Sequence, residues 1–138
     1  MSTFQVEVVS AEGQIFSGEA TAVYAAAMTG EIGILPRHAP LLTKLRPGAL
    51  RVQTAGGEQA IFIGGGIMEV QPKLVTILAD SAMRAGDGDE VAAAAAKARA
   101  EEMLANASKD IDLAAAQQEL VEAAARLKFI QDLKKTSG

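Results

Sequence analysis

The first part of the chain alternates apolar and polar positions in short runs. Phe4, Val6 and Val8 alternate with polar neighbours, which is the period-two pattern of a strand with one face in the core. Similar strand-like runs cover residues 14–17, 49–54, 58–63, 67–70 and 74–78. The turn signals that separate them lie at 12–14, 55–57 and 71–73. Because no helical pattern intervenes, this spacing predicts an antiparallel β-sandwich of about eight to ten short strands.

From residue 87 the apolar positions follow the three- and four-residue spacing of helices. Asp87 begins a sequence similar to a capping box, and the first helix is expected to end near Ala107. Asp110 or Asp112 is placed to cap a second helix that reaches about Lys134. Its apolar seam alternates large and small side chains, namely Leu113, Ala116, Leu120, Ala123, Leu127 and Ile130. The two helices are therefore predicted to pack as an antiparallel hairpin.

Composition supports the same division. All four prolines and 11 of the 13 glycines lie in residues 1–86, whereas residues 87–138 contain 15 of the 28 alanines. Alanine loses no side-chain entropy in a helix. We therefore predict a sandwich domain at 1–86 and a helical domain at 87–138. The first helix offers mostly methyl groups for burial, which favours a weakly held hairpin that can change position, although a permanently docked cap is equally consistent with composition.

Charge and cysteine content exclude several classes of function. The net charge of −4, the 4% aromatic content and the absence of Trp argue against a nucleic-acid surface. The absence of cysteine excludes disulfides, thiolate zinc sites and a cysteine nucleophile, and fits a cytoplasmic setting. The first residues lack the pattern of a signal peptide, and no apolar run approaches 18 residues. We expect no direct membrane insertion.

Candidate reactive groups are few. His38 has no second His or Cys with which to complete a metal site or a triad, so a structural or contact role is favoured. Gly64–Gly66 has the glycine content of a phosphate loop, but no Gly-Lys-[Ser/Thr] follows it. We predict no catalytic residue, metal or cofactor. The second helix ends in a basic cluster that suits either the helix dipole or an acidic partner, namely Arg126, Lys128, Lys134 and Lys135.

One segment is distinctive. Residues 30–42, GEIGILPRHAPLL, closely resemble the signature of the epsilon subunit of bacterial F-type ATP synthases. Other segments resemble the same family in the same order: VSAE at 9–12, FSG at 16–18, GGIMEVQP at 65–72 and TILADSA at 76–82. The resemblance covers essentially the whole chain.

The resemblance implies a ten-stranded β-sandwich followed by two helices. Such a subunit has no active site and lies in the central stalk, at the cytoplasmic face of the bacterial inner membrane. Its sandwich binds the gamma subunit, and its signature loop approaches the ring of c subunits. In this chain the matching loop residues are Gly30, Glu31, Gly33, Pro36, His38 and Pro40, and Glu31 and His38 are expected at the ring contact. Arg37 stands where the family usually has glycine.

The resemblance also implies that the hairpin is regulatory. In the family it lies compact or extends along gamma into the catalytic alpha/beta hexamer, where it blocks ATP hydrolysis. Here the candidate inhibitory contacts are Arg126, Lys128, Lys134 and Lys135.

Some relatives bind ATP through a motif at the start of the first helix. Asp89 is kept in this chain, and Arg99 and Arg126 match further basic positions. The arginine of the motif is Ala92, however, and another expected arginine falls on Glu122. Asp89, Arg99 and Arg126 are thus expected to form a vestigial ATP site at most.

Two other classes stay open. The chain could be a free-standing small-molecule-binding sandwich with a helical tail, in which Gly64–Gly66 line a pocket, or a small hydrolase that uses His38. Co-purification with gamma and the catalytic hexamer distinguishes the stalk subunit from a lone ligand-carrying monomer.

Overall fold

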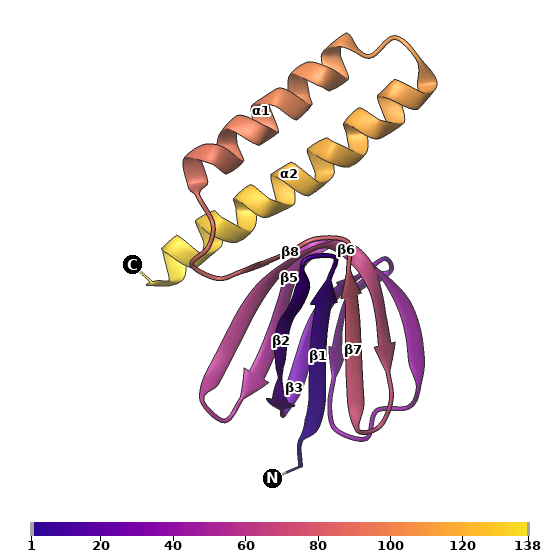
Figure 1. The fold of residues 1–138 in the computed structure, drawn as a ribbon, viewed down its shortest axis with the longest axis vertical. Coiled ribbons are helices and arrows are strands. Elements are labelled where there is room, and N and C mark those ends of the chain that lie inside the picture. The colour runs from indigo at the N-terminus through magenta and orange to yellow at the C-terminus, as the bar shows by residue number, and fades with distance from the viewer. Residues whose placement is uncertain (1, 138) are drawn as a thin grey trace. The chain divides into compact units, whose positions relative to one another are not determined.

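The computed structural model describes residues 2–137 and separates the chain into two compact units, Met1–Ala85 and Gly86–Gly138. The first unit consists of β-strands and the second of two helices (Figure 1). The predicted architecture of a sandwich followed by a helical pair is confirmed. Within the described residues the sandwich has eight strands, which agrees with the eight to ten predicted from the pattern and is fewer than the ten that the resemblance implied.

The strands form one continuous sheet. In chain order they are β1 (Phe4–Ser10), β2 (Gly13–Ala20), β3 (Ala22–Ala27), β4 (Gly30–Ile34), β5 (Leu41–Thr54), β6 (Gly57–Val70), β7 (Leu74–Ala79) and β8 (Ala82–Arg84). Their spatial order is β2-β1-β7-β6-β5-β3-β4, and β8 pairs with β6. β1 and β7 run parallel, which corrects the prediction of a purely antiparallel sandwich. These two strands are distant in sequence, so no hairpin turn dictates their relative direction.

The strand number lies at the lower end of the predicted eight to ten because short runs merge. Two of the runs, 58–63 and 67–70, belong to the single strand β6, whose pairing with β5 continues past Gly64–Gly66. Residues 66–70 of β6 pair with β7, and residues 61–63 pair with β8, so the sheet folds back on itself at these glycines. Glycine in a strand often marks such a bend.

Gly66 also explains why this segment is not a phosphate loop. Its φ is +145°, and a Cβ atom there would collide with the carbonyl oxygen of Leu78 and lie 2.9 Å from the Cα of Ala79. The glycine is therefore needed for the close approach of β7. Main-chain hydrogen bonds cross the same bend, from Asp80 N to Gly65 O at 2.8 Å and from Gly64 N to Ser81 O at 2.8 Å. These contacts argue against a ligand pocket lined by the three glycines.

The sandwich core follows the predicted alternation. Phe4, Val6 and Val8 of β1 are at most 3% exposed, while the residues between them are half-buried. Strands from across the sheet contribute large, fully buried side chains to the unit, among them Ile34, Leu50, Phe62, Met68 and Ile77. A core of this kind gives the first unit its own source of stability.

The second unit is the predicted hairpin of α1 (Glu90–Asn106) and α2 (Asp110–Ser137). The N-cap of α1 is Asp89, not Asp87, because the Oδ1 atom of Asp89 accepts hydrogen bonds from the main-chain N–H groups of Val91 and Ala92 at 3.0 and 3.2 Å. Within residues 2–137, no helix is long and apolar enough to cross a membrane.

The predicted seam of α2 is only partly buried. Ala116 and Ile130 are buried, but Leu113 near the start of the helix is 39% exposed. On α1 the buried residues are Ala93 and Ala100. Of the five buried residues in the described part of the hairpin, three are alanines, and Phe129 and Ile130 are the two large ones.

Candidate functional site

The predicted contact segment is divided between a strand and a loop. Gly30–Ile34 form β4, and the connection to β5 follows. Glu31 therefore lies near the start of β4 and His38 beyond its end, separated along the strand by about 10 Å or more at ~3.3 Å per residue. Among the residues that the structure describes, no contact joins these two side chains.

The loop after β4 is tied to the turn between β6 and β7. The main-chain N–H of Arg37 donates to the carbonyl oxygen of Pro72 at 3.2 Å, and Nδ1 of His38 lies 2.7 Å from the carbonyl oxygen of Ala39. Arg37 has a φ of 66°, in the left-handed region that favours glycine. This chain thus places an arginine in a backbone conformation that suits glycine.

The left-handed conformation of Arg37 leads to a stability prediction. Arg37→Gly should raise the free energy of unfolding by about 1 kcal/mol, because a left-handed L-residue costs ~1–2 kcal/mol and the flexibility of glycine in the unfolded chain offsets part of the gain. Urea denaturation of the full chain measures the change. Arg84→Gly, at an exposed arginine with negative φ, is the control and should not stabilise. A less stable Arg37→Gly protein would contradict the prediction.

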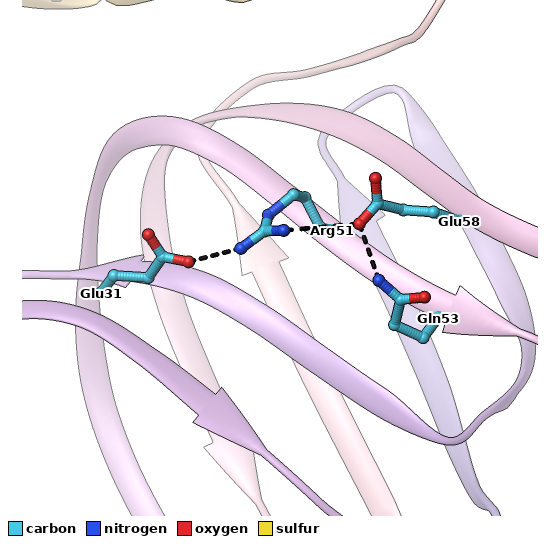
Figure 2. A network of polar contacts seen from close by, with 4 residues as sticks. All are labelled: Glu31, Arg51, Gln53 and Glu58. Carbon is cyan, nitrogen blue, oxygen red and sulfur yellow. Dashed lines mark hydrogen bonds and ion pairs between the residues drawn. The ribbon is translucent and has the colours of Figure 1, made fainter.

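Glu31 is held by an arginine that the sequence did not single out. Its Oε1 lies 2.7 Å from Nη2 of Arg51, whose Nη1 lies 3.5 Å from Oε1 of Glu58 (Figure 2). The hydrogen bond to Glu31 is the main cause that raises the pKa of Arg51. Glu31 and Arg51 are far apart in sequence and are brought together by the pairing of β3 with β4 and β5, whereas the hairpin of β5 and β6 places Glu58 near Arg51. No local motif could have revealed Arg51.

An apolar patch lies on the outward face of the sandwich. We define the apolar patch as Met28, Leu42, Ile67 and Leu78, whose exposed fractions are 62, 68, 41 and 56%. Ile67 and Leu78 are direct partners across β6 and β7, and Ile67 also pairs with Lys44 of β5. The N–H of Met28 donates to the carbonyl oxygen of Lys44 at 3.0 Å. Grouped exposed apolar side chains often mark interaction surfaces.

The basic cluster of α2 is engaged inside the hairpin. Ion pairs join Arg126 to Glu122 at 3.4 Å, Lys128 to Asp132 at 2.8 Å and Lys134 to Glu90 at 2.7 Å. The ammonium groups of Lys128 and Lys134 are exposed, whereas the Arg126–Glu122 pair is part-buried. Exposed pairs contribute little to stability, so Lys128 and Lys134 can exchange their partners for other acidic groups at small cost.

The ion pairs with Lys134 and Lys128 lower the pKa of two carboxyl groups, those of Glu90 and Asp132. The hydrogen bond from Lys134 is the main cause that lowers the pKa of Glu90. The pKa of Asp132 is lowered mainly by the hydrogen bond from Lys128, with a smaller contribution from the charge of Lys135. Both carboxyl groups therefore stay ionised to a lower pH than they would without these lysines.

A cleft of about 670 Å³ lies between α1 and α2 and collects part of the predicted vestigial ATP site. Its charged lining consists of Arg99, Arg126, Glu102, Glu119 and Glu122. Asp89 is not among the lining residues, because its carboxylate caps α1. Two arginines against three glutamates leave the lining at a formal charge of −1, which disfavours phosphate groups.

The charge of this cleft predicts weak nucleotide affinity. Adding millimolar ATP to the isolated full chain should leave its thermal midpoint unchanged, since a ligand stabilises a protein only when its concentration exceeds the Kd. Differential scanning fluorimetry tests this, and Glu122→Arg, which restores a basic residue, should gain a shift. A clear stabilisation of the unaltered chain would contradict the prediction.

Taken together, the candidate features are surfaces for contact. In the part of the chain that the structure describes, no three His, Cys, Asp or Glu side chains gather as a metal site. The exposed features are the apolar patch, the Glu31–Arg51 pair and the basic end of α2. The fold and these surfaces define a sandwich-and-hairpin subunit of a larger assembly.

Family models identify that assembly. The β-sandwich domain of the ATP synthase delta/epsilon chain matches residues 3–85, and the long α-helix domain of the same chain matches residues 89–131. The chain therefore belongs to the ATP synthase delta/epsilon chain family, in which it is an epsilon chain without a catalytic role of its own.

Individual relatives agree with this assignment. The chain is 54% identical over 137 residues to the ATP synthase epsilon chain of Xylella fastidiosa, covering 99% of this chain and 98% of the relative. It is 56% identical over 136 residues to that of Alkalilimnicola ehrlichii, covering 98% and 97%. A chain in the mitochondrial ATP synthase of Euglena gracilis has the same fold, with a TM-score of 0.73, 19% identity and coverage of 100% and 83%.

Proposed function

We propose that this chain is a central-stalk subunit of a bacterial ATP synthase that couples proton flow to rotation and restrains ATP hydrolysis. Its sandwich binds the gamma subunit and the c-ring, and its hairpin inhibits the catalytic alpha/beta hexamer. The complex holds it as a peripheral subunit at the cytoplasmic face of the inner membrane. The observation that carries the proposal is the apolar patch, exposed on a chain of the epsilon family.

The apolar patch is the proposed gamma-binding surface. Its four large side chains project from neighbouring strands and loops of the sheet, so a partner can cover them together. Burial of a large apolar side chain contributes about 1.5–3 kcal/mol, enough to anchor a permanent subunit contact. Lys44, which pairs with Ile67 and whose carbonyl oxygen accepts the N–H of Met28, lies between these two residues and can supply a polar contact within the surface.

A charge placed in the apolar patch should disrupt assembly. Leu78→Glu is expected to reduce recovery with gamma and the catalytic hexamer by about tenfold or more, because a carboxylate would be buried in the contact. Co-purification from cells that express the other subunits measures recovery. Ile111→Glu, at an 83% exposed position of α2, is the matched control and should assemble normally. Equal recovery of both variants would exclude the apolar patch as the gamma contact.

The signature segment is the proposed contact with the c-ring. Glu31 carries an exposed carboxylate at the start of β4, and His38 lies in the loop at the other end of that strand. Replacing Glu31 by a bulky or basic residue should weaken coupling in reconstituted vesicles. Unchanged proton pumping would argue against this contact.

The hairpin is the proposed inhibitory element. Arg126, Lys128, Lys134 and Lys135 are candidates for contacts with acidic segments of the catalytic subunits. The ion pairs that Lys128 and Lys134 form within the hairpin have exposed ammonium groups and can exchange partners, which supports this role, while the Arg126–Glu122 pair is part-buried.

A further inference from the structure

Glu31 is supported by a stack of residues from three neighbouring strands, namely Gly33 of β4, Tyr24 of β3 and Arg51 of β5. Gly33 of β4 is the register partner of Tyr24 in β3. A Cβ atom at Gly33 would lie 3.0 Å from Cε1 and 3.2 Å from Cδ1 of the Tyr24 ring. The backbone of Gly33 does not have a positive φ, so glycine is needed here for space. The second glycine of the signature segment therefore makes room for an aromatic ring.

Arg51 forms the next layer of the stack. It is the register partner of Tyr24 in β5, and its guanidinium carbon lies 4.7 Å from the centre of the Tyr24 ring. A cation over an aromatic face within about 6 Å is attracted to the ring. This attraction to the Tyr24 ring restricts where the guanidinium of Arg51 can lie.

The guanidinium in turn orients two carboxylates on opposite sides. Nη2 contacts Glu31 at 2.7 Å and Nη1 contacts Glu58 at 3.5 Å, while Nε2 of Gln53 donates to Oε1 of Glu58 at 2.7 Å (Figure 2). Because two different nitrogens are used, the fork cannot turn without losing a contact. Among the described residues, Oε2 of Glu31 makes no hydrogen bond or ion pair.

We propose that Arg51 is a positioning residue that presents the free carboxylate oxygen of Glu31 to a hydrogen-bond donor of the c-ring. This inference rests on the proposed ring contact of Glu31. Exposed ion pairs add little to folding stability, so a gain in folding stability does not account for the stack of Gly33, Tyr24 and Arg51. Fixing the glutamate side chain before docking removes the entropy cost of ordering it, which is worth about two- to tenfold in affinity.

The test compares variants of the full chain assembled in the synthase and reconstituted in vesicles. The measured quantity is the ratio of proton pumping to ATP hydrolysis. Arg51→Gln should lower this ratio about two- to tenfold, in the same direction as Glu31→Gln. The double variant should be no worse than Glu31→Gln alone. Arg51→Lys should lower this ratio less than Arg51→Gln does, because lysine keeps the charge but lacks the planar guanidinium fork. Arg84→Gln removes an exposed arginine elsewhere and should have no effect.

A second readout follows the stack in the isolated full-length subunit. The Nη–H signals of Arg51 in NMR spectra should be protected from exchange, because Nη2 and Nη1 contact the carboxylates of Glu31 and Glu58, and Glu31→Gln or Tyr24→Leu should reduce that protection. If Glu31→Gln leaves coupling unchanged, the ring contact itself fails, and the inference fails with it. If Glu31→Gln impairs coupling but Arg51→Gln does not, or if the two effects add, positioning by Arg51 is overturned while the ring contact stands.

Discussion

A chain that ends at Ala85 is expected to fold, to join the synthase complex and to raise its ATPase activity several-fold. The eight strands and the core between them all lie within Met1–Ala85, so removal of the hairpin leaves the sandwich with its own stabilising contacts. The increase in activity follows from the proposed inhibitory role of the hairpin. Thermal denaturation of the truncated chain and ATP hydrolysis by the reassembled enzyme measure the two effects.

Point variants separate the two parts of this prediction. The full chain with Arg126, Lys128, Lys134 and Lys135 all changed to Gln should assemble normally and also hydrolyse ATP faster, if these cations make the inhibitory contacts. A truncated chain that does not fold or assemble would contradict the independence of the sandwich. Normal assembly with unchanged hydrolysis would instead contradict inhibition by the hairpin.

Gly66→Ala is expected to be the most damaging single substitution in the sandwich. The new methyl group would collide with the carbonyl oxygen of Leu78 while the backbone holds a φ of +145° that alanine rarely adopts. Steric overlap and backbone strain together should lower the free energy of unfolding by about 3 kcal/mol or more, a large fraction of the stability of a small domain. Urea denaturation measures the loss where the variant is soluble.

Gly56→Ala is the matched control for this substitution. Gly56 lies in the turn between β5 and β6, does not have a positive φ, and a Cβ atom there would meet only Oγ1 of Thr54, at 3.9 Å. Its replacement should change stability by no more than about 0.5 kcal/mol. Similar losses in both variants would show that the close approach of β7 at Gly66 is not the cause.

Most elements of the fold could be predicted because their signals are local. The alternation of Phe4, Val6 and Val8 predicted β1 and its buried face, and the alanine-rich composition after residue 87 predicted the helices. The errors arose where local signals compete. Gly64–Gly66 suggested an interruption, but the pairing of β6 with β5 continues through it, and Asp89 rather than Asp87 reaches the free N–H groups of α1.

The candidate surfaces were predictable only in part. Glu31 and His38 could be selected from the sequence through the resemblance of the signature segment. Their separation at opposite ends of β4 could not, because the segment contains both a strand and a loop. Likewise, the basic residues of α2 were evident, but their ion pairs depend on which acidic side chains the helical hairpin brings near them.

The sequence by itself determined the division into a strand-rich unit and an alanine-rich helical unit, and it contained the signature by which the family could be recognised. Both depend on composition and on neighbours along the chain. Only the tertiary structure decided that β1 pairs in parallel with β7, that the exposed side chains of Ile67 and Leu78 are neighbours across β6 and β7, and that Arg51 packs on Tyr24 and pairs with Glu31. Those arrangements join residues from different strands, and they exist only once the sheet has paired and folded back at Gly64–Gly66.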